Sequence, residues 1–219
     1  ELERDPLLVW TNGYAEFPVD RAAFRATPPD VPGLRLVEDM RAEELRKLYT
    51  YNTFHAALAY AGARRDCRTI VDCFAEPAVR AEAEGALDEA RRALQAEFGW
   101  SDEAMDRWTR GVVTQTNNPT LRDTVARYGA DPRRKLRRTD RLVGPLLLAR
   151  THGIPTPHLV RALAGALYYR NPDDAGAAAV EERIAELGLD SAIRTLCELE
   201  DDEDDIVAAV VDAYDQLEA

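Results

Sequence analysis

Helix boundary signals recur along most of this chain, and they constrain its fold more than any other feature. Capping residues or prolines precede apolar residues at helical spacing, and glycines follow them. The starts are at Asp39, Pro77, Ser101, Asp131 with Pro132, and Thr156 with Pro157, and the ends are at Gly62, Gly99, Gly129 and Gly188. This succession predicts a mainly α, multi-helix fold for residues 39–219.

Two further prolines subdivide the helical region. Asn118 and Pro119 restart the helical pattern, which then continues to Gly129. Pro145 lies inside DRLVGPLLLARTHG, where its ring and missing N–H predict a kink or a break near residue 144. We expect the apolar residues after this proline to be buried.

Residues 1–38 differ in composition from the rest of the chain. LLVWTNGYAEFPVD contains strand-forming residues, and TPPDVPGL is a proline-rich connection. The segment therefore predicts one or two strands ahead of the helical domain. No other segment is an obvious partner for them, so we expect residues 7–20 to be the end of a sheet whose other strands lie outside this chain.

Charge and cysteine usage argue against several classes of partner. The formal net charge of −12 would repel nucleic acid and anionic membranes.

The chain has neither a run of about twenty uncharged apolar residues nor a signal peptide at its start, so the expected compartment is the cytoplasm. The three cysteines lack C-x2-C spacing, and His152 and His158 match no ligand set, so we expect reduced thiols and no metal site.

Two charged runs stand out against this background. RRKLRRTDR, residues 133–141, contains six cations and one acid. It indicates either a site for a local anionic ligand or a solvated basic face that offsets acids elsewhere. ELEDDEDD, residues 198–205, is typical of a solvated connection whose last acids favour the N-terminus of the final helix.

The most informative pattern for function is K-x4-N-x2-H in KLYTYNTFH. It places Lys47, Asn52 and His55 along one helix. At about 100° per residue, Asn52 lies roughly 140° and His55 roughly 80° around the helix axis from Lys47, so all three can reach one side pocket. An amine, an amide and an imidazole can remove a proton from an alcohol and hydrogen-bond the oxygen that remains, as metal-free alcohol oxidation requires.

Several longer segments resemble the C-terminal half of the enzymes of the mannitol dehydrogenase family. These enzymes are polyol-specific, metal-independent long-chain dehydrogenases. They are KLYTYNTFHAALAYAG, NNPTLRDTVARYGADPRRKLRRTDRLVGPLL and THGIPTPHLVRALAGALYYR. The resemblance extends from about Val9 to Leu217 and is closest to the mannitol-1-phosphate 5-dehydrogenases. It implies a helical C-terminal domain like those of mannitol and 6-phosphogluconate dehydrogenases.

This resemblance also implies roles for the three residues of the motif. Lys47 would be the general base, accepting the hydroxyl proton while hydride leaves the same carbon for nicotinamide. Asn52 and His55 would bind the reacting oxygen. No metal takes part in such a reaction, so the helical domain would contribute both substrate binding and catalysis.

The substrate would be a polyol or a sugar phosphate, with mannitol 1-phosphate as the first candidate. Asn118 matches the N-P turn of the family, and Arg134 and Lys135 match its R-K-L segment near the substrate. The chain departs from the pattern at Gln115, where mannitol-phosphate enzymes resemble one another in having Arg. Two alternative functions therefore remain. One is a dehydrogenase for a non-phosphorylated polyol or a hexuronate, and the other is a non-catalytic helical binding domain.

The cofactor implied by the resemblance is NAD or NADP, bound mainly by an N-terminal Rossmann domain. No G-x-G-x-x-G pattern occurs in this chain, and no βαβ unit fits before Lys47. We therefore expect no cofactor-binding residue here, and the strands of residues 1–38 to be left from that domain. The Rossmann domain would be the partner of this chain, which would be inactive without it.

Overall fold

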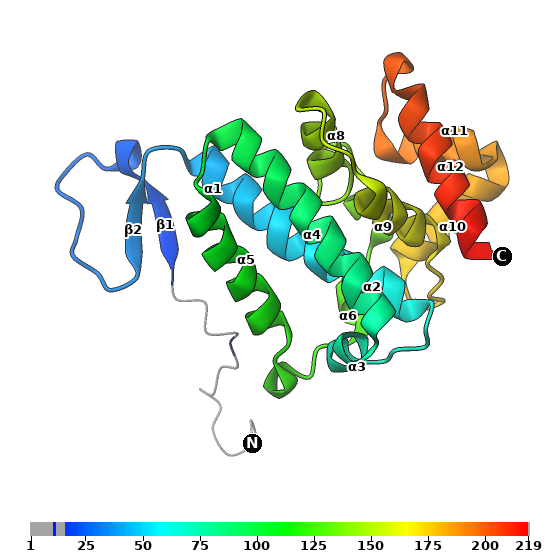
Figure 1. The fold of residues 1–219 in the computed structure, drawn as a ribbon, viewed down its shortest axis with the longest axis horizontal. Coiled ribbons are helices and arrows are strands. Elements are labelled where there is room, and N and C mark those ends of the chain that lie inside the picture. The colour runs from blue at the N-terminus through cyan, green and yellow to red at the C-terminus, as the bar shows by residue number, and fades with distance from the viewer. Residues whose placement is uncertain (1–10, 12–15, 219) are drawn as a thin grey trace.

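The computed structural model describes residue 11 and residues 16–218, and shows a helical body preceded by a small sheet (Figure 1). The strands are β1 (Phe17–Asp20) and β2 (Leu34–Val37). The helices are α1 (Met40–Lys47), α2 (Thr53–Ala63), α3 (Ile70–Ala75), α4 (Pro77–Phe98), α5 (Asp102–Thr116), α6 (Val125–Gly129), α7 (Pro132–Lys135), α8 (Val143–Thr151), α9 (Pro157–Tyr168), α10 (Ala175–Leu187), α11 (Leu189–Cys197) and α12 (Asp204–Glu218). A π-helical turn, η2 (Leu48–Asn52), joins α1 to α2, and short 3₁₀ turns are η1 (Arg21–Ala23), η3 (Pro119–Leu121) and η4 (Asp201–Glu203). The predicted mainly α fold is confirmed.

Most helix boundaries fall where the capping residues predict them. The Asp39 carboxylate accepts the N–H of Ala42 at 2.9 Å, and the Ser101 hydroxyl accepts the N–H of Ala104 at 3.3 Å. Prolines occupy the first position of α4, α7 and α9, where a missing N–H costs nothing. Gly99 ends α4 with a left-handed φ of 67°.

Other boundaries differ from the expectation for a physical reason. The run from Asn118 to Gly129 is divided, because Arg122 adopts a left-handed φ of 52° between η3 and α6. Gly62 does not end α2 as a cap. It lies buried one residue before the last, where an added Cβ would lie 2.3 Å from the Cys73 sulfur. Close packing of α2 on α3 is thus the reason for this glycine.

Pro145 lies in the first turn of α8, so the predicted break falls just before Val143. A proline is tolerated there because first-turn N–H groups have no partner within the helix. Leu146 and Ala149, which follow it, are buried as expected.

The sheet corrects the expectation that the opening strand has no partner in this chain. β1 and β2 pair in parallel, with Phe17 opposite Leu34 and Asp20 opposite Val37. Strand β2 begins at Leu34, the last residue of TPPDVPGL, which the sequence indicated to be a connection. Arg35 on β2 fixes it to α1 through two hydrogen bonds to the Glu43 carboxylate, at 2.6 and 3.0 Å. The expectation for residues 7–15 lies outside the described residues, apart from Thr11.

The core is centred on α2, which packs on α4, α6 and α9. AALA, residues 56–59, is completely buried on all sides of the helix. Its three alanines are small, so the neighbouring helices can approach closely. Glu89 of α4 is also buried, and its carboxylate accepts the N–H groups of His158 and Leu159 at 3.0 and 2.8 Å. Because those donors would otherwise be unsatisfied at the start of α9, this acid joins the two helices.

The acidic run of residues 198–205 is not wholly solvated, in contrast to the expectation. Glu203 is buried and accepts two hydrogen bonds from the Arg138 guanidinium, at 2.7 and 2.9 Å. This contact fixes η4 and the start of α12 to the basic segment. Within the described part of the chain, no helix is both long and apolar enough to cross a membrane.

Candidate active site

A π-helical turn interrupts the helix that carries the K-x4-N-x2-H motif. The Thr50 hydroxyl donates to the Arg46 carbonyl, the acceptor that a regular α-helix would assign to the N–H of Thr50. Trp108 of α5 donates its indole N–H to the same hydroxyl at 2.8 Å. A π turn bonds residues five apart, so it brings Lys47 and Asn52 closer to one face than the roughly 140° expected for an α-helix.

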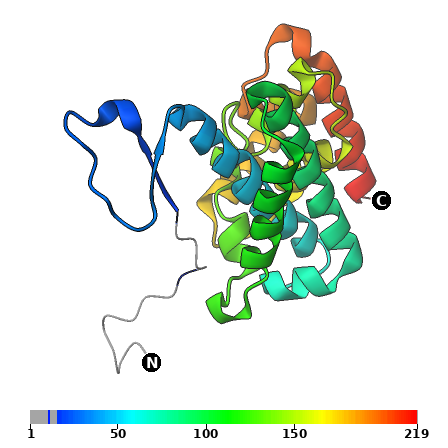
Figure 2. The same cartoon turned by 60° about the vertical axis from the view of Figure 1, so that its left-hand side comes forward.

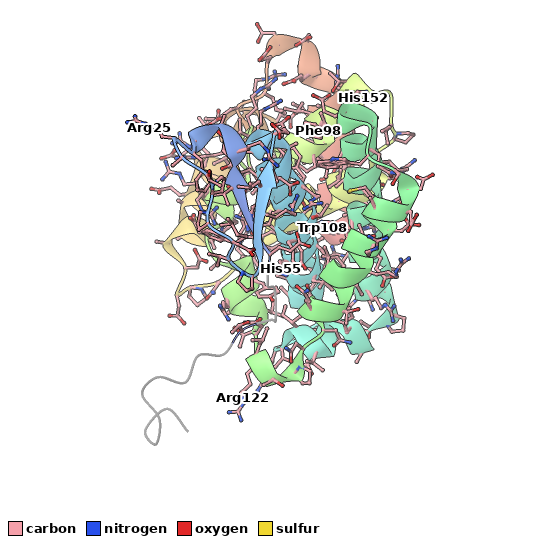
Figure 3. The ribbon with its side chains drawn as sticks, turned by 90° about the vertical axis from the view of Figure 1, so that its left-hand side faces the viewer. Arg25, His55, Phe98, Trp108, Arg122 and His152 are labelled. Carbon is pink, nitrogen blue, oxygen red and sulfur yellow. The ribbon has the colours of Figure 1, made fainter. Side chains whose placement is uncertain are left out.

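The three motif residues differ in their surroundings. Lys47 is exposed and Asn52 is half-buried. His55, which is labelled in Figure 3, is half-buried and lines a cavity. Lys47 lies near enough to His55 to be one of the cations that lower the pKa of its imidazole. This interaction links the first and last residues of the motif across the π turn η2.

The cavity beside His55 has a volume of about 400 Å³. Its walls come from α2, α5, η3, α6 and the segment before the sheet. The described lining residues are Thr11, His55, Gln115, Thr116, Leu121, Asp123, Arg127 and Tyr128. Of the six site residues expected from the sequence, only His55 is among them.

His55 is held in a fixed orientation and a neutral state. Its ring stacks on Tyr128 at 4.2 Å between centroids and meets the Tyr51 ring edge-on at 6.1 Å. Burial lowers the pKa of His55 to about 3, and the nearby cations Arg141, Lys135, Lys47 and Arg127 add to this effect.

The hydrogen bonds of Thr116 select the tautomer of His55. The single hydroxyl hydrogen of Thr116 is donated to the Val112 carbonyl at 2.7 Å, and the same oxygen lies 3.0 Å from His55 Nε2. The oxygen therefore accepts from Nε2–H, which leaves Nδ1 unprotonated. A neutral imidazole with a proton on Nε2 can donate a hydrogen bond to a substrate oxygen.

Asp123 organises the opposite wall of the cavity. It is buried, and its carboxylate accepts hydrogen bonds from the Arg127 guanidinium and, at 2.8 Å, from the Tyr128 hydroxyl. Burial and this carboxylate together raise the pKa of Tyr128, so the hydroxyl remains a donor at neutral pH. Asp123, Arg127 and Tyr128 were not predicted as site residues, because nothing in their own segment indicates that they face His55.

The remaining expected residues have structural partners of their own. The Asn118 side chain accepts the N–H of Thr120 at 3.0 Å and so caps η3. Arg134 forms ion pairs with Asp131 at 3.2 Å and with Asp140 at 3.0 Å. Arg138 and Arg141 of the basic run also pair with acids, Glu203 and Asp140 respectively.

Lys135 departs from the expectation of a solvated basic face, because only 3% of it is exposed. Its ammonium donates to the Tyr128 carbonyl and lies 5.7 Å from the centre of the Tyr60 ring. Burial, with Arg141 and Arg134 nearby, lowers the pKa of Lys135 to about 7. Lys135 thus lies behind Tyr128, in the layer that supports the cavity wall.

Comparison with known proteins assigns this chain to a family. A family model described as the mannitol dehydrogenase C-terminal domain matches residues 39–218, beginning at the Asp39 cap of α1. The chain belongs to the mannitol dehydrogenase family. The resemblance predicted from the sequence segments is thereby confirmed at the family level.

A solved structure shows that the fold of this mannitol dehydrogenase domain is shared. It is the Pseudomonas fluorescens mannitol 2-dehydrogenase in ternary complex with NAD and D-mannitol. The match has a TM-score of 0.66 and 18% sequence identity, and covers 85% of this chain and 40% of that chain. The present chain thus spans less than half the length of that enzyme.

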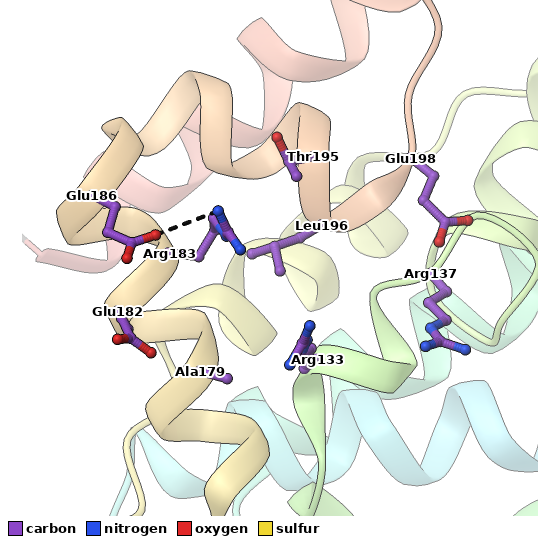
Figure 4. Close-up of a pocket in the computed structure, with 9 residues that line it drawn as sticks. All are labelled: Arg133, Arg137, Ala179, Glu182, Arg183, Glu186, Thr195, Leu196 and Glu198. Atoms are coloured by element: carbon purple, nitrogen blue, oxygen red, sulfur yellow. Dashed lines mark ion pairs between the residues drawn. The ribbon is translucent and has the colours of Figure 1, made fainter.

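This mannitol dehydrogenase domain has a second hollow, of about 240 Å³, among α7, α10 and α11 (Figure 4). Its described lining residues are Arg133, Arg137, Ala179, Glu182, Arg183, Glu186, Thr195, Leu196 and Glu198. The Arg183–Glu186 ion pair, at 3.3 Å, lies on its wall. Arginines and glutamates are equal in number here, so the hollow has no excess of positive charge. No expected site residue lines it.

Within the described residues, no group of three or more His, Cys, Asp or Glu side chains is arranged to hold a metal ion. Cys73 and Cys197 are buried, Cys67 is half-buried, and all three thiols are free.

Proposed function

We propose that this chain is the substrate-binding and catalytic part of an NAD- or NADP-dependent polyol dehydrogenase that transfers hydride without a metal. The observation that carries the proposal is the cavity of hydrogen-bonding side chains around His55, which follows Lys47 and Asn52 along the continuous helical segment α1–η2–α2. Membership of the mannitol dehydrogenase family supports it.

Each residue of the motif has one role in this proposal. Lys47 accepts the proton of the substrate hydroxyl as hydride leaves the carbon for nicotinamide, which yields a carbonyl compound and the reduced cofactor. Asn52 and the Nε2–H of His55 donate hydrogen bonds to the oxygen as negative charge develops on it. The substrate oxygen then takes the position of acceptor that Thr116 holds in the free chain.

A lysine must be held partly neutral to act as a base, and Lys47 is exposed in this chain. A cofactor domain that closes over this face would remove water from Lys47 and favour its neutral form. The proposal therefore includes a dinucleotide-binding domain as the partner of this chain, and predicts that the chain alone is inactive.

The substrate chain would extend from the motif towards Asn118, Arg134 and Lys135, the residues that match the family pattern. Lys135 would contribute from behind the cavity wall, because its ammonium is buried and donates to the Tyr128 carbonyl. Asn118 lies beside the cavity, two residues after Thr116 and three before Leu121. The candidate substrates are polyols and their phosphates.

The test joins this chain to a dinucleotide-binding domain of the same family and follows polyol-dependent reduction of NAD or NADP. Lys47→Ala should lower kcat/KM by roughly 10²- to 10⁴-fold, the usual contribution of a general base. Arg107→Ala is the control. Arg107 is largely exposed on α5, where its guanidinium pairs with Glu103 at 2.8 Å, so its loss should leave kcat/KM nearly unchanged.

Two outcomes would contradict the proposal. One is full activity of the Lys47→Ala enzyme, which would remove Lys47 from the mechanism. The other is a joined protein that binds NAD yet oxidises no polyol or polyol phosphate, which would favour a non-catalytic helical binding domain.

A further inference from the structure

Among the described residues that line the cavity beside His55, the one positively charged side chain is paired with an acid. Arg127 is the one arginine or lysine among its described lining residues, and it forms an ion pair with the buried carboxylate of Asp123. His55 is neutral, as described above. Two residues of the basic run, Arg141 and Lys135, lie near His55. Arg141 pairs with Asp140 at 2.8 Å, and Lys135 is buried behind the cavity wall, where its ammonium donates to the Tyr128 carbonyl.

Gln115 presents hydrogen-bond donors to this cavity. The Tyr51 hydroxyl donates to Gln115 Oε1 at 2.6 Å, and this bond fixes which end of the amide is the oxygen. The Nε2 amino group is then available to the cavity that Gln115 lines. Since Tyr51 also packs edge-on against His55 and Trp108, the support of Gln115 is built into the core.

We propose that this cavity selects an uncharged polyol and discriminates against polyol phosphates and hexuronates, with Gln115 and the Asp123–Arg127 pair as the residues that set this preference. The inference rests on the proposed function and narrows its substrate class. Gln115 is a specificity-determining residue because its amide N–H groups donate hydrogen bonds to the substrate. Asp123 contributes because its carboxylate pairs with the Arg127 guanidinium and neutralises its charge.

The physical basis is the cost of placing an unpaired anion in a partly closed site. A phosphate monoester has a charge of about −1.5 to −2 at neutral pH and is normally bound by unpaired Arg or Lys side chains. In this cavity a phosphate would lie near the Asp123 carboxylate, and the Arg127 guanidinium is already paired with that carboxylate. Hydroxyl groups lose much less on leaving water, and the amide of Gln115, the hydroxyl of Thr116 and the imidazole of His55 supply partners for them.

The experiment compares kcat/KM for D-mannitol, D-mannitol 1-phosphate and a hexuronate in the chain joined to its dinucleotide-binding domain. The unaltered enzyme should prefer D-mannitol. Gln115→Arg introduces an unpaired cation and should shift the ratio of the two mannitol rates roughly 10- to 100-fold towards the phosphate, the effect of one charge-assisted hydrogen bond.

Thr114→Arg is the matched control, because it adds the same charge one residue away. Thr114 is exposed and lines the groove between α4 and α5 instead of the cavity, so the ratio should change less than about threefold there. Asp123→Asn is a second variant that releases the charge of Arg127 without adding bulk, and it should shift the ratio in the same direction as Gln115→Arg.

The outcomes separate this inference from the proposed function. Preference of the unaltered enzyme for D-mannitol 1-phosphate or a hexuronate would overturn the inference while the dehydrogenase function stands. Equal shifts in Gln115→Arg and Thr114→Arg would overturn the role of Gln115 in the same way. Oxidation of none of the compounds by an enzyme that binds NAD would overturn both.

Discussion

At the scale of single residues, the neutral state of His55 has consequences for stability as well as for chemistry. The imidazole is enclosed by two tyrosine rings and lies near several cations, so protonation in the folded state is strongly unfavourable. In the unfolded chain, the imidazole has an ordinary pKa of about 6.5. Between about pH 6.5 and pH 3, the unfolded state therefore binds one proton more than the folded state.

This difference predicts that the free energy of unfolding falls with decreasing pH more steeply in the unaltered chain than in His55→Asn. The excess slope should approach about 1.4 kcal/mol per pH unit below about pH 6, because it reflects one proton. Urea unfolding at about pH 5, 6 and 7.5 measures it. The difference between the two proteins should become constant above about pH 7.5, where the unfolded histidine is also neutral. Parallel pH profiles throughout would show that His55 is protonated normally.

The sequence revealed this histidine but not the residues that define its state. K-x4-N-x2-H is local, so it could be recognised in a single segment. Thr116 lies 61 positions from His55 along the chain, and Gln115 lies 64 positions from Tyr51. Such contacts are created by the packing of α5 and α6 against α2, and no local pattern predicts them.

At the scale of elements, the π turn η2 is held by α8 as well as by α5. Tyr49, in this turn, is buried against Gly144 at the start of α8. A Cβ on Gly144 would lie 2.3 Å from the Tyr49 hydroxyl oxygen and 2.6 Å from the ring carbon that carries it. The glycine therefore makes room for a ring that fixes the turn between Lys47 and Asn52.

Gly144→Ala should therefore destabilise the chain by about 1–3 kcal/mol, the usual cost of overpacking, because the buried Tyr49 ring has to move. Gly111→Ala is the matched control. Gly111 lies within α5 with no atom within 4 Å of its added Cβ, so alanine should stabilise the chain by about 0.5–1 kcal/mol. Urea unfolding of both variants gives the comparison. The two changes in the free energy of unfolding should have opposite signs. Stabilisation by Gly144→Ala would show that Tyr49 does not fix the turn.

Elements with local signals were predictable, and those that depend on neighbours were not. The caps at Asp39 and Ser101 act within one helical turn, and the sequence located both correctly. The π turn depends on the indole of Trp108, and β2 depends on pairing with β1 and on the Arg35–Glu43 contact. Neither has a signature within its own four or five residues.

At the scale of the whole molecule, the sheet lies at one end of the helical body, and α10–α12 lie at the other (Figures 1 and 2). The family match begins at residue 39, after both strands. Phe17 of β1 is 67% exposed, although parallel strands are normally covered on both faces. A sheet of two strands is also marginally stable by itself. These features support the prediction that further strands of a cofactor domain complete the sheet.

Amide hydrogen exchange rates in β1 and β2 test this prediction directly. In the chain alone, the amides of β1 and β2 should exchange much faster than those of α2 and α4, since two paired strands bury little apolar surface. Joining the dinucleotide-binding domain should slow exchange in both strands by at least about tenfold, because new hydrogen bonds and packing would have to open first. The amides of α12, at the far end, should be unaffected and serve as the internal control. If β1 and β2 exchange equally fast with and without the domain, the sheet is not completed by it, and the joined enzyme must be held together through its helices.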